Sequence, residues 1–327
     1  MVFADRIQRH WRSVSVVSVL LIPLSFVYWG AIKLRQAAYR LGLLRVYHFR
    51  APVVVVGNLT VGGTGKTPFV IALAEQLKQR GWSPGIVSRG YQGEACDGEL
   101  VPAGGDPRRF GDEPVLAAQK TGLPVAVARR RAHGVERLLR ESVDVVISDD
   151  GLQHYSMGRS AEIAMIDGGE GFGNGFLLPA GPLREPAARV KSVDIRVRRG
   201  GEPGPGEYGV DVSLGLLRNL VTGEEVSLHA FREETLAAVA GIHRPERFFH
   251  LLKQHGLTIS EHPFPDHHQF VPEDVPTNRT VLMTEKDAVK CVRFASNRCW
   301  AVTQVTKIPE TLIDDLERII RPTANAA

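Results

Sequence analysis

A strand, a glycine-rich loop and a helix start follow one another between residues 53 and 77, and this segment constrains the fold more than any other part of the sequence. Four consecutive valines, Val53–Val56, predict a buried strand. Next comes the loop Thr60-Val61-Gly62-Gly63-Thr64-Gly65, after which Lys66-Thr67 begin an apolar run with helical spacing. Free backbone N–H groups at such a turn, together with the positive end of the helix dipole, bind phosphate. The segment therefore predicts an α/β protein of the P-loop NTPase type, with a mostly parallel sheet flanked by helices.

The polar side chains of this segment have specific expected roles. Lys66 would reach the β- and γ-phosphates of a bound nucleotide, and the Thr67 hydroxyl would bind Mg²⁺. In the pattern G-x-x-x-x-G-K-[ST] the first glycine falls on Thr60, so only the inner part of the loop fits. The alternative is a glycine-rich β-to-α turn with a chance lysine. The strand before the loop and the helix after it favour the phosphate-binding interpretation.

The composition indicates a folded protein in a reducing compartment. The 327 residues are enough for two domains, and 43% are hydrophobic while 23% are charged. The three cysteines, Cys96, Cys291 and Cys299, are far apart and form no CxxC pair, which argues against a disulfide framework or a zinc site. Eight of the 40 Lys and Arg residues lie in the first 50 residues, with Asp5 as the only acid there. The rest is slightly acidic, which argues against a nucleic-acid partner.

Residues 13–32 form an uncharged, mostly apolar stretch between Arg12 and Lys33. Its length is close to the roughly 20 residues that span a bilayer. Four serines, a central Pro23 and basic residues on both flanks weigh against a spanning helix, and the lack of a small-x-small site weighs against a cleaved signal peptide. We therefore expect residues 1–45 to form a basic, hydrophobic helix at the membrane interface. A spanning helix and a core helix of the globular domain are the alternatives.

Downstream of the loop, helix and strand patterns alternate, as in an α/β fold. Residues 46–200 are predicted as the nucleotide-binding domain, with the strand at 193–197 closing its sheet. A Gly-, Pro- and Glu-rich composition at 199–209 indicates a boundary. Residues 201–230 would then be a hairpin-like linker, and 231–327 a second, smaller α/β domain that closes the cleft. Further strands are expected at 83–91, 123–128, 143–150, 162–167, 236–242, 281–284 and 299–303, and helices near 111–119, 130–141, 245–255 and 309–320.

Two acids end the strand at 143–150. In phosphate-loop enzymes an acid at the end of a neighbouring strand binds Mg²⁺ directly or through water, and open α/β sheets bind ligands at this edge. Asp149 and Asp150 are therefore expected to bind the metal together with Thr67. The alternative is a pair of solvated acids at a strand end.

The segment Phe264-Pro265-Asp266-His267-His268 has three interpretations. With His262 it could form a metal cluster, although the spacing suits no common site. His267 could be an ordinary loop residue. It could also be carried across a cleft between the two domains to serve the chemistry there.

Together these segments resemble one family, the tetraacyldisaccharide 4′-kinases of the lipid A pathway in Gram-negative bacteria. Thr60 at the first loop glycine is similar to the small polar residue that this family has there. The matching motifs occur in order along the chain: Val56–Pro68, Ser88–Tyr91, Gly111–Pro114, Asp149–His154, Leu178–Pro186, Phe264–His267 and Thr284–Asp287.

The resemblance implies transfer of the γ-phosphate of ATP to the 4′-hydroxyl of an acylated glucosamine disaccharide 1-phosphate, with Mg²⁺ as cofactor. By similarity, Asp112 would be the base that takes the hydroxyl proton, and His267 would orient Asp112 or tune its pKa. The resemblance also implies a location at the cytoplasmic face of the inner membrane and no obligate protein partner. Arg184 and the basic N-terminal residues are candidates for binding the acceptor phosphate. Thr284–Asp287 match a family motif for which we derive no role.

Two other functions are compatible with a phosphate loop. The first is another phosphate-loop enzyme, such as a soluble small-molecule kinase or a GTPase-like metallochaperone. A GTPase would have an N-K-x-D loop, and the nearest segment, Thr284-Glu285-Lys286-Asp287, lacks the Asn. The second is a nucleotide-binding membrane scaffold, which predicts that Asp112 and His267 are dispensable.

Overall fold

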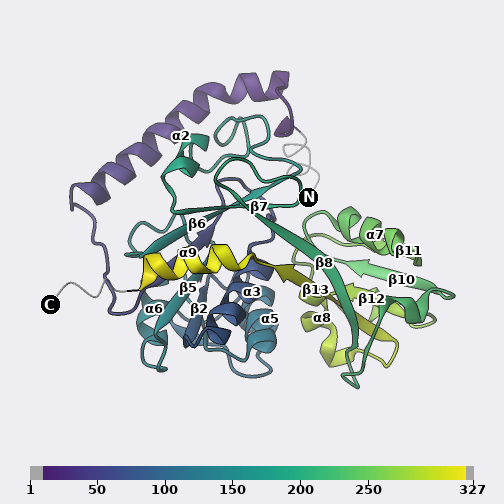
Figure 1. The fold of residues 1–327 in the computed structure, drawn as a ribbon. Coiled ribbons are helices and arrows are strands. Elements are labelled where there is room, and N and C mark those ends of the chain that lie inside the picture. Colours follow the sequence, from purple (N-terminus) through teal and green to yellow (C-terminus); the bar gives the residue numbers. More distant parts are fainter. Residues whose placement is uncertain (1–9, 322–327) are drawn as a thin grey trace.

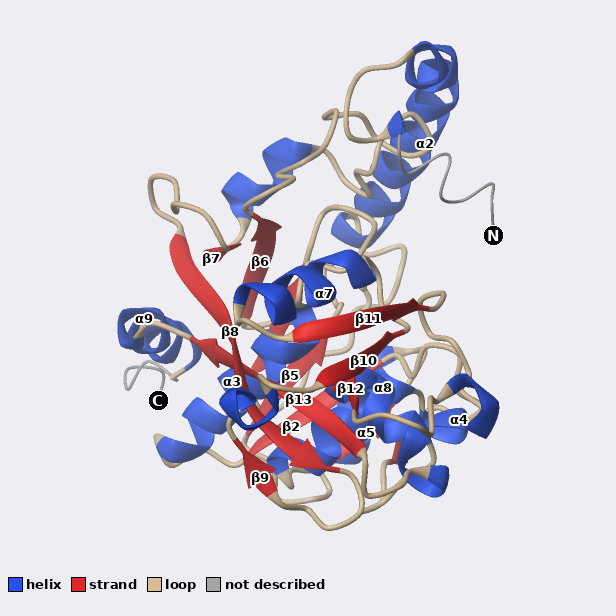
Figure 2. Cartoon of the chain, turned by 90° about the vertical axis from the view of Figure 1, so that its right-hand side faces the viewer, coloured by secondary structure: helices blue, strands red, loops and turns tan. Residues whose placement is uncertain are grey.

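One continuous sheet organises the computed structural model, which describes residues 10–321 (Figure 1). Over these residues the sheet has 13 strands, in the order β11-β10-β12-β13-β8-β7-β6-β1-β5-β2-β4-β3, with β9 paired to β8. Helices cover both faces of the sheet (Figure 2). Three of the N-terminal charges, Asp5, Arg6 and Arg9, lie outside the described residues.

The first half of the sheet is parallel from β7 to β4, and β3 adds an antiparallel edge. Valines of β1 are fully buried because helices pack on both faces of this strand. The predicted strand–loop–helix unit and the alternation after it are confirmed. The strands are β1 (Val53–Gly57), β2 (Pro84–Ser88), β3 (Glu99–Leu100), β4 (Val125–Val127), β5 (Val145–Asp149), β6 (Ala161–Asp167) and β7 (Ile195–Arg199). The helices are α3 (Lys66–Gln79), α4 (Pro107–Phe110), α5 (Asp112–Thr121), α6 (Arg131–Leu138) and the 3₁₀ helix η1 (Ala187–Ser192).

The second half of the sheet is attached through β8 (Tyr208–Asn219), which pairs parallel with β7 and antiparallel with β13. The expectation that the strand at 193–197 closes the first sheet is therefore wrong, because β8 satisfies the open edge of β7. The remaining strands are β9 (Glu225–Val226), β10 (Thr235–Ala240), β11 (Thr258–Pro263), β12 (Val281–Thr284) and β13 (Cys299–Lys307). The helices are α7 (Pro245–Gln254), α8 (Glu285–Cys291), α9 (Glu310–Ile320) and the 3₁₀ helices η2 (Leu228–Phe231), η3 (Pro272–Asp274) and η4 (Val292–Phe294).

The last helix, α9, packs on the first half of the sheet although it follows the second half in sequence (Figure 1, yellow). Its apolar residues Leu312, Ile313 and Leu316 are fully buried in the same core as Leu73 and Leu77 of α3. Trp82 Nε1 also donates to Glu317 at 2.8 Å. Helix α9 therefore stabilises the domain that carries the phosphate loop.

The N-terminal helix α2 (Val16–Arg40) runs along one side of the molecule, apart from the sheet (Figure 1, purple). Ser15 caps it by accepting a hydrogen bond from the Ser18 amide. It has the length and hydropathy of a membrane span, and only 11% of its most apolar 18-residue stretch is buried against the rest of the protein. The core-helix alternative is wrong for this reason.

Candidate active site

The phosphate loop joins β1 to α3, and its shape depends on glycines with left-handed backbone. Gly65 precedes α3 at φ 78°, and a Cβ there would lie 2.8 Å from the Arg199 side chain. The loop is anchored from outside, since the Val61 amide donates to Pro182 O at 2.8 Å and Thr60 bridges to Leu183. Lys66 and Thr67 are the first two residues of α3. The loop therefore directs the N-terminus of α3 toward the carboxyl ends of β1 and β5.

Lys66 lies between polar groups of two strands. Its ammonium donates to Asn58 Oδ1 at 3.0 Å and is 3.4 Å from Asp150 Oδ1. Arg184 donates to both carboxylate oxygens of Asp150 at 3.0 Å. Burial favours the neutral acid, but these two cations outweigh it and hold the pKa of Asp150 well below its usual range. Asp150 is thus an ionised group at the loop.

Asp149 has a different environment from its neighbour. Thr67 Oγ1 donates to its Oδ2 at 3.1 Å, while its Oδ1 is buried without a hydrogen-bond partner among residues 10–321. Burial, reinforced by the negative charge of Glu113, raises the pKa of Asp149 to about 7. An unsatisfied carboxylate oxygen beside a hydroxyl is the oxygen-rich donor set that Mg²⁺ prefers. Of the residues expected to bind the metal, Asp149 and Thr67 lie together and fit it, while both carboxylate oxygens of Asp150 accept from Arg184.

Asp112 and His267 meet although they are 155 positions apart in the sequence. Asp112 is the first residue of α5, and its Oδ2 lies 3.0 Å from His267 Nδ1. Its other oxygen accepts the Glu113 amide at 2.8 Å. His267 has a left-handed backbone, φ 59°, and its ring lies beside that of Tyr91, with 4.9 Å between centroids. The predicted contact between the two halves of the chain is present.

The metal interpretation of the histidines is wrong. His268 pairs with Asp274 at 2.8 Å, and His262 lies 3.2 Å from the Ser260 hydroxyl, so the three rings have separate partners. Within the part of the chain that the structure describes, no group of three or more His, Cys, Asp or Glu side chains could hold a metal ion. Any Mg²⁺ at Asp149 would therefore take further oxygens from Thr67, from Asp150 or from phosphate.

Several polar residues of the site escaped the sequence analysis. Asn58 is fully buried and accepts from Lys66. Arg131, also buried, donates to the backbone oxygens of Ala128 and Asp149, which fixes the end of β5. Burial lowers the pKa of Arg131 to about 10. Arg131 is the third of three consecutive arginines, and nothing in the sequence separates it from its exposed neighbours.

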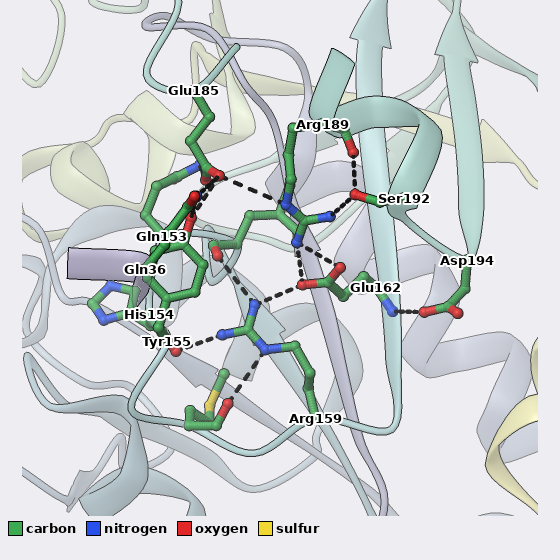
Figure 3. Close-up of polar contacts among 12 residues, drawn as sticks. Gln36, Gln153, His154, Tyr155, Arg159, Glu162, Glu185, Arg189, Ser192 and Asp194 are labelled. Atoms are coloured by element: carbon green, nitrogen blue, oxygen red, sulfur yellow. Dashed lines mark hydrogen bonds and ion pairs between the residues drawn. The ribbon is translucent and has the colours of Figure 1, made fainter. Parts of the chain in front are cut away.

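Helix α2 is tied to this site by a polar network around the buried Glu185 (Figure 3). Glu185 accepts from Tyr155 Oη at 2.5 Å and from Gln153 at 3.0 Å. Gln36, on α2, donates to both Glu185 and Tyr155. A further bond links α2 to the residue beside Glu185, since Tyr28 Oη donates to Arg184 O at 3.1 Å. The helix that faces away from the sheet is therefore anchored directly to residues that border Asp150.

A cavity of about 220 Å³ lies against the phosphate loop. Its walls come from both halves of the sheet and from the N-terminal segment, with Thr60–Thr64, Glu170, Arg244 and Trp11 among them. Arg244 and Glu170 form an ion pair across it. The phosphate loop therefore borders an open cavity.

A family model described as Tetraacyldisaccharide-1-P 4'-kinase matches residues 17–321. The chain belongs to this family. Two of its similar relatives are named Tetraacyldisaccharide 4'-kinase. The one from Methylobacillus flagellatus is 44% identical over 319 residues, covering 96% of this chain and 95% of the relative. The one from Nitrosococcus oceani is 46% identical over 311 residues, covering 94% of this chain and 92% of the relative. The family resemblance seen in the sequence is confirmed.

A solved family member has the same fold. The "apo" form of LpxK from Aquifex aeolicus, in complex with ATP, is 30% identical and superposes with a TM-score of 0.80. The match covers 93% of this chain and all of that structure. The predicted P-loop-type α/β fold is therefore confirmed, and the chain is a phosphotransferase of this kinase family.

Proposed function

We propose that this chain transfers the γ-phosphate of ATP to the 4′-hydroxyl of a tetraacylated glucosamine disaccharide 1-phosphate, giving lipid IVA. Its family membership and the near-complete coverage of relatives named Tetraacyldisaccharide 4'-kinase support this substrate. The ATP complex of the Aquifex aeolicus relative supports the nucleotide. The observation that carries the proposal is the hydrogen-bonded Asp112–His267 pair in a chain that also has a phosphate loop, because a loop alone serves any nucleotide-binding protein.

In this mechanism the loop holds the triphosphate and Asp112 takes a proton. Residues Thr60–Thr67 surround the phosphates, and the Lys66 ammonium neutralises charge on the β- and γ-phosphates. Burial favours the protonated form of Asp112, but the His267 hydrogen bond and nearby lysines outweigh it and lower the Asp112 pKa, so the carboxylate is ready to accept a proton. The sugar O–H gives its proton to Asp112 as its oxygen bonds to the γ-phosphorus, and the bond to the β–γ bridging oxygen breaks to release ADP.

Thr67, Asp149 and Asp150 are the proposed holders of Mg²⁺. The buried, unsatisfied Oδ1 of Asp149 and the adjacent Thr67 hydroxyl support this role. When bound, Mg²⁺ would neutralise charge on the phosphates. Arg184 connects this site to helix α2, because its guanidinium binds Asp150 while its backbone oxygen accepts from Tyr28 of α2.

The proposed location is the cytoplasmic face of the inner membrane, with α2 lying on the bilayer. One face of α2 is apolar and exposed, with Val16, Leu20, Val27 and Leu34 each at least 70% accessible. The opposite face is occupied, for example by the Ser25 hydroxyl, which donates to Leu177 O at 2.9 Å. A helix with one face held by its own domain and the other apolar suits interfacial attachment. A lipid acceptor would then reach the loop without leaving the membrane surface.

Phosphate transfer from labelled ATP in mixed micelles tests this function. The wild type with Mg²⁺ should label a tetraacylated disaccharide 1-phosphate and should turn over little ATP without it. Asp112→Asn should slow transfer by the roughly 10²–10⁴-fold that a lost general base costs. Asp211→Asn, an exchange of the same kind at an exposed position of β8, should leave the rate unchanged. ATP turnover without acceptor, or an unaffected Asp112→Asn, would favour a nucleotide-binding scaffold or another phosphate-loop enzyme.

A further inference from the structure

The segment Thr284-Glu285-Lys286-Asp287, which had no derived role, ends β12 and begins α8. Thr284 caps the helix, since its hydroxyl accepts the Asp287 amide at 3.2 Å and donates to Asp287 Oδ2 at 2.7 Å. Asp287 is fully buried and also accepts the Gly241 amide at 2.9 Å. These bonds fix the start of α8 to the loop that follows β10.

The same loop holds His267. The carbonyl of Gly241 accepts the His267 amide at 3.2 Å, while the Gly241 amide binds Asp287. A Cβ at position 241 would lie 3.2 Å from Asp287 Oδ1 and from Pro265 O, which leaves little room for a side chain. One residue thus connects the backbone of His267 to the first turn of α8.

Lys286, in that first turn, directs its ammonium at the Asp112–His267 pair. Its Nζ lies 3.3 Å from His267 Nε2 and 4.0 Å from Asp112 Oδ2. Two more carboxylates hold it there, Asp266 at 3.2 Å and Glu113 at 3.4 Å. Glu113 belongs to α5 and Asp266 to the segment after β11, so Lys286 binds groups from both elements that meet at the Asp112–His267 contact.

The chemistry of these groups assigns the protons. An ammonium has only donors, so its contact with Nε2 requires a lone pair on that nitrogen. The single proton of a neutral imidazole must then be on Nδ1, which is the atom that faces Asp112 Oδ2. With Lys286 in place, His267 is a donor to Asp112 and has no free nitrogen to accept a substrate proton.

We propose that Lys286 is a positioning residue for the Asp112–His267 pair, which fixes the tautomer of His267 and leaves Asp112 as the group that accepts the hydroxyl proton. This inference rests on the proposed function. It gives the motif at residues 284–287 a role: Thr284 and Asp287 fix the turn, and Lys286 is the side chain that the turn presents.

Charges around Asp112 come from every element packed against it. Lys286 and Lys290 approach from α8, His267 and Asp266 from the segment after β11, and Glu113 from its own helix. Lys290 is 3.8 Å from Asp112 but is also paired with Asp287 at 2.8 Å. Removing Lys286 therefore takes away an attraction that Lys290 replaces only in part. Asp112 should then need a higher pH to ionise.

The kinetic test compares Lys286→Met and Lys286→Arg in the full-length enzyme, with the micelle assay run from pH 5 to 9. We expect Lys286→Met to lower kcat by roughly 10–100-fold, less than loss of the base itself. The acid limb of the pH profile of Lys286→Met should move to higher pH by about one unit, because a cation within 4–6 Å favours the ionised form of the Asp112 carboxylate. Lys286→Arg keeps the charge and should keep the wild-type pH profile. Lys253→Met, an exposed lysine paired with Glu261, is the matched control and should behave as wild type.

A second readout does not depend on the acceptor. The ¹⁵N shifts of the His267 ring, assigned with His267→Gln, report which nitrogen carries the proton. The wild type should show Nδ1–H, and Lys286→Met should show a mixture of tautomers. An unchanged tautomer together with an unchanged pH profile in Lys286→Met would overturn the inference. A wild type that labels no lipid but shows Nδ1–H lost on Lys286→Met would instead overturn the proposed function.

Discussion

Adjacent residues of identical chemistry have opposite properties at this site. Asp149 is the last residue of β5, where burial and the charge of Glu113 raise its pKa to about 7. Asp150 follows with a left-handed backbone, φ 51°, which turns its carboxylate toward Lys66 and Arg184 and lowers its pKa. The sequence predicts two acids at a strand end. Their different environments come from one backbone turn and from cations contributed by other elements.

Asp167 allows a residue-scale prediction about stability. It accepts the Gly169 and Glu170 amides at 3.0 and 3.1 Å and binds Arg247 of α7 at 2.8 Å. Burial would raise the pKa of Asp167, but the Arg247 hydrogen bond and charge outweigh it, so the pKa is below its usual range. We expect Asp167→Asn to lower the free energy of unfolding by about 1–3 kcal/mol at pH 7.

The sign of the pH effect follows from that direction. A carboxyl whose folded pKa is depressed stabilises the protein above its unfolded pKa of about 3.9, and this contribution is lost as pH falls through the folded value. In urea unfolding of the nucleotide-free protein, the free energy of unfolding of wild type should therefore exceed that of Asp167→Asn at pH 7. This difference should be smaller at pH 3. An equal difference in the free energy of unfolding at both pH values would contradict the electrostatic cause. Asp211→Asn serves as the control.

At the scale of elements, helix α9 follows the second half of the sheet in sequence and packs on the core of the first half. The sequence predicts an amphipathic helix at 309–320, and the structure confirms it. Its position on the first half of the sheet is not readable from its periodicity, because an apolar stripe says that a face is buried but does not name the surface that buries it.

Substitution within α9 tests its contribution to the phosphate-loop domain. Leu316 is fully buried against that core, so Leu316→Ala should destabilise the protein by about 2–5 kcal/mol through lost contacts and a cavity. Ile319→Ala, on the exposed side of the same helix, should cost much less. Denaturant unfolding followed by tryptophan fluorescence measures both effects, and Trp82, which donates to Glu317, is one of the four tryptophans. Equal effects of the two substitutions would show that α9 does not pack as described.

At the scale of the whole molecule, helix α2 has an exposed apolar face and another face that is hydrogen-bonded to the rest of the protein. The apolar face that carries Leu20 and Val27 is exposed, while Gln36 and Tyr28 join α2 to Glu185 and Arg184. Attachment to a membrane along α2 would therefore orient the entry to the phosphate loop relative to the bilayer surface.

Vesicle binding tests that arrangement. The double variant Leu20→Gln/Val27→Gln should retain its melting temperature, because both side chains are exposed, and should lose most co-sedimentation with anionic vesicles. Val221→Gln/Val305→Gln changes two exposed valines, one in the turn after β8 and one in β13, and should bind vesicles as the wild type does. If the Leu20→Gln/Val27→Gln protein instead remains in the membrane after an alkaline carbonate wash, α2 spans the bilayer.

The sequence by itself determined what depends on neighbours along the chain. The valine run, the glycines of the loop and Lys66-Thr67 predict a phosphate site because strand, turn and helix N-terminus are consecutive. The family motifs are likewise short stretches of consecutive residues, and their order along the chain indicates the family. Only the tertiary structure decided which distant groups meet, namely Lys286 beside His267, α9 on the first core and β8 across both halves of the sheet. Such contacts depend on how buried faces and sheet edges are satisfied in three dimensions, and local patterns do not encode the partner.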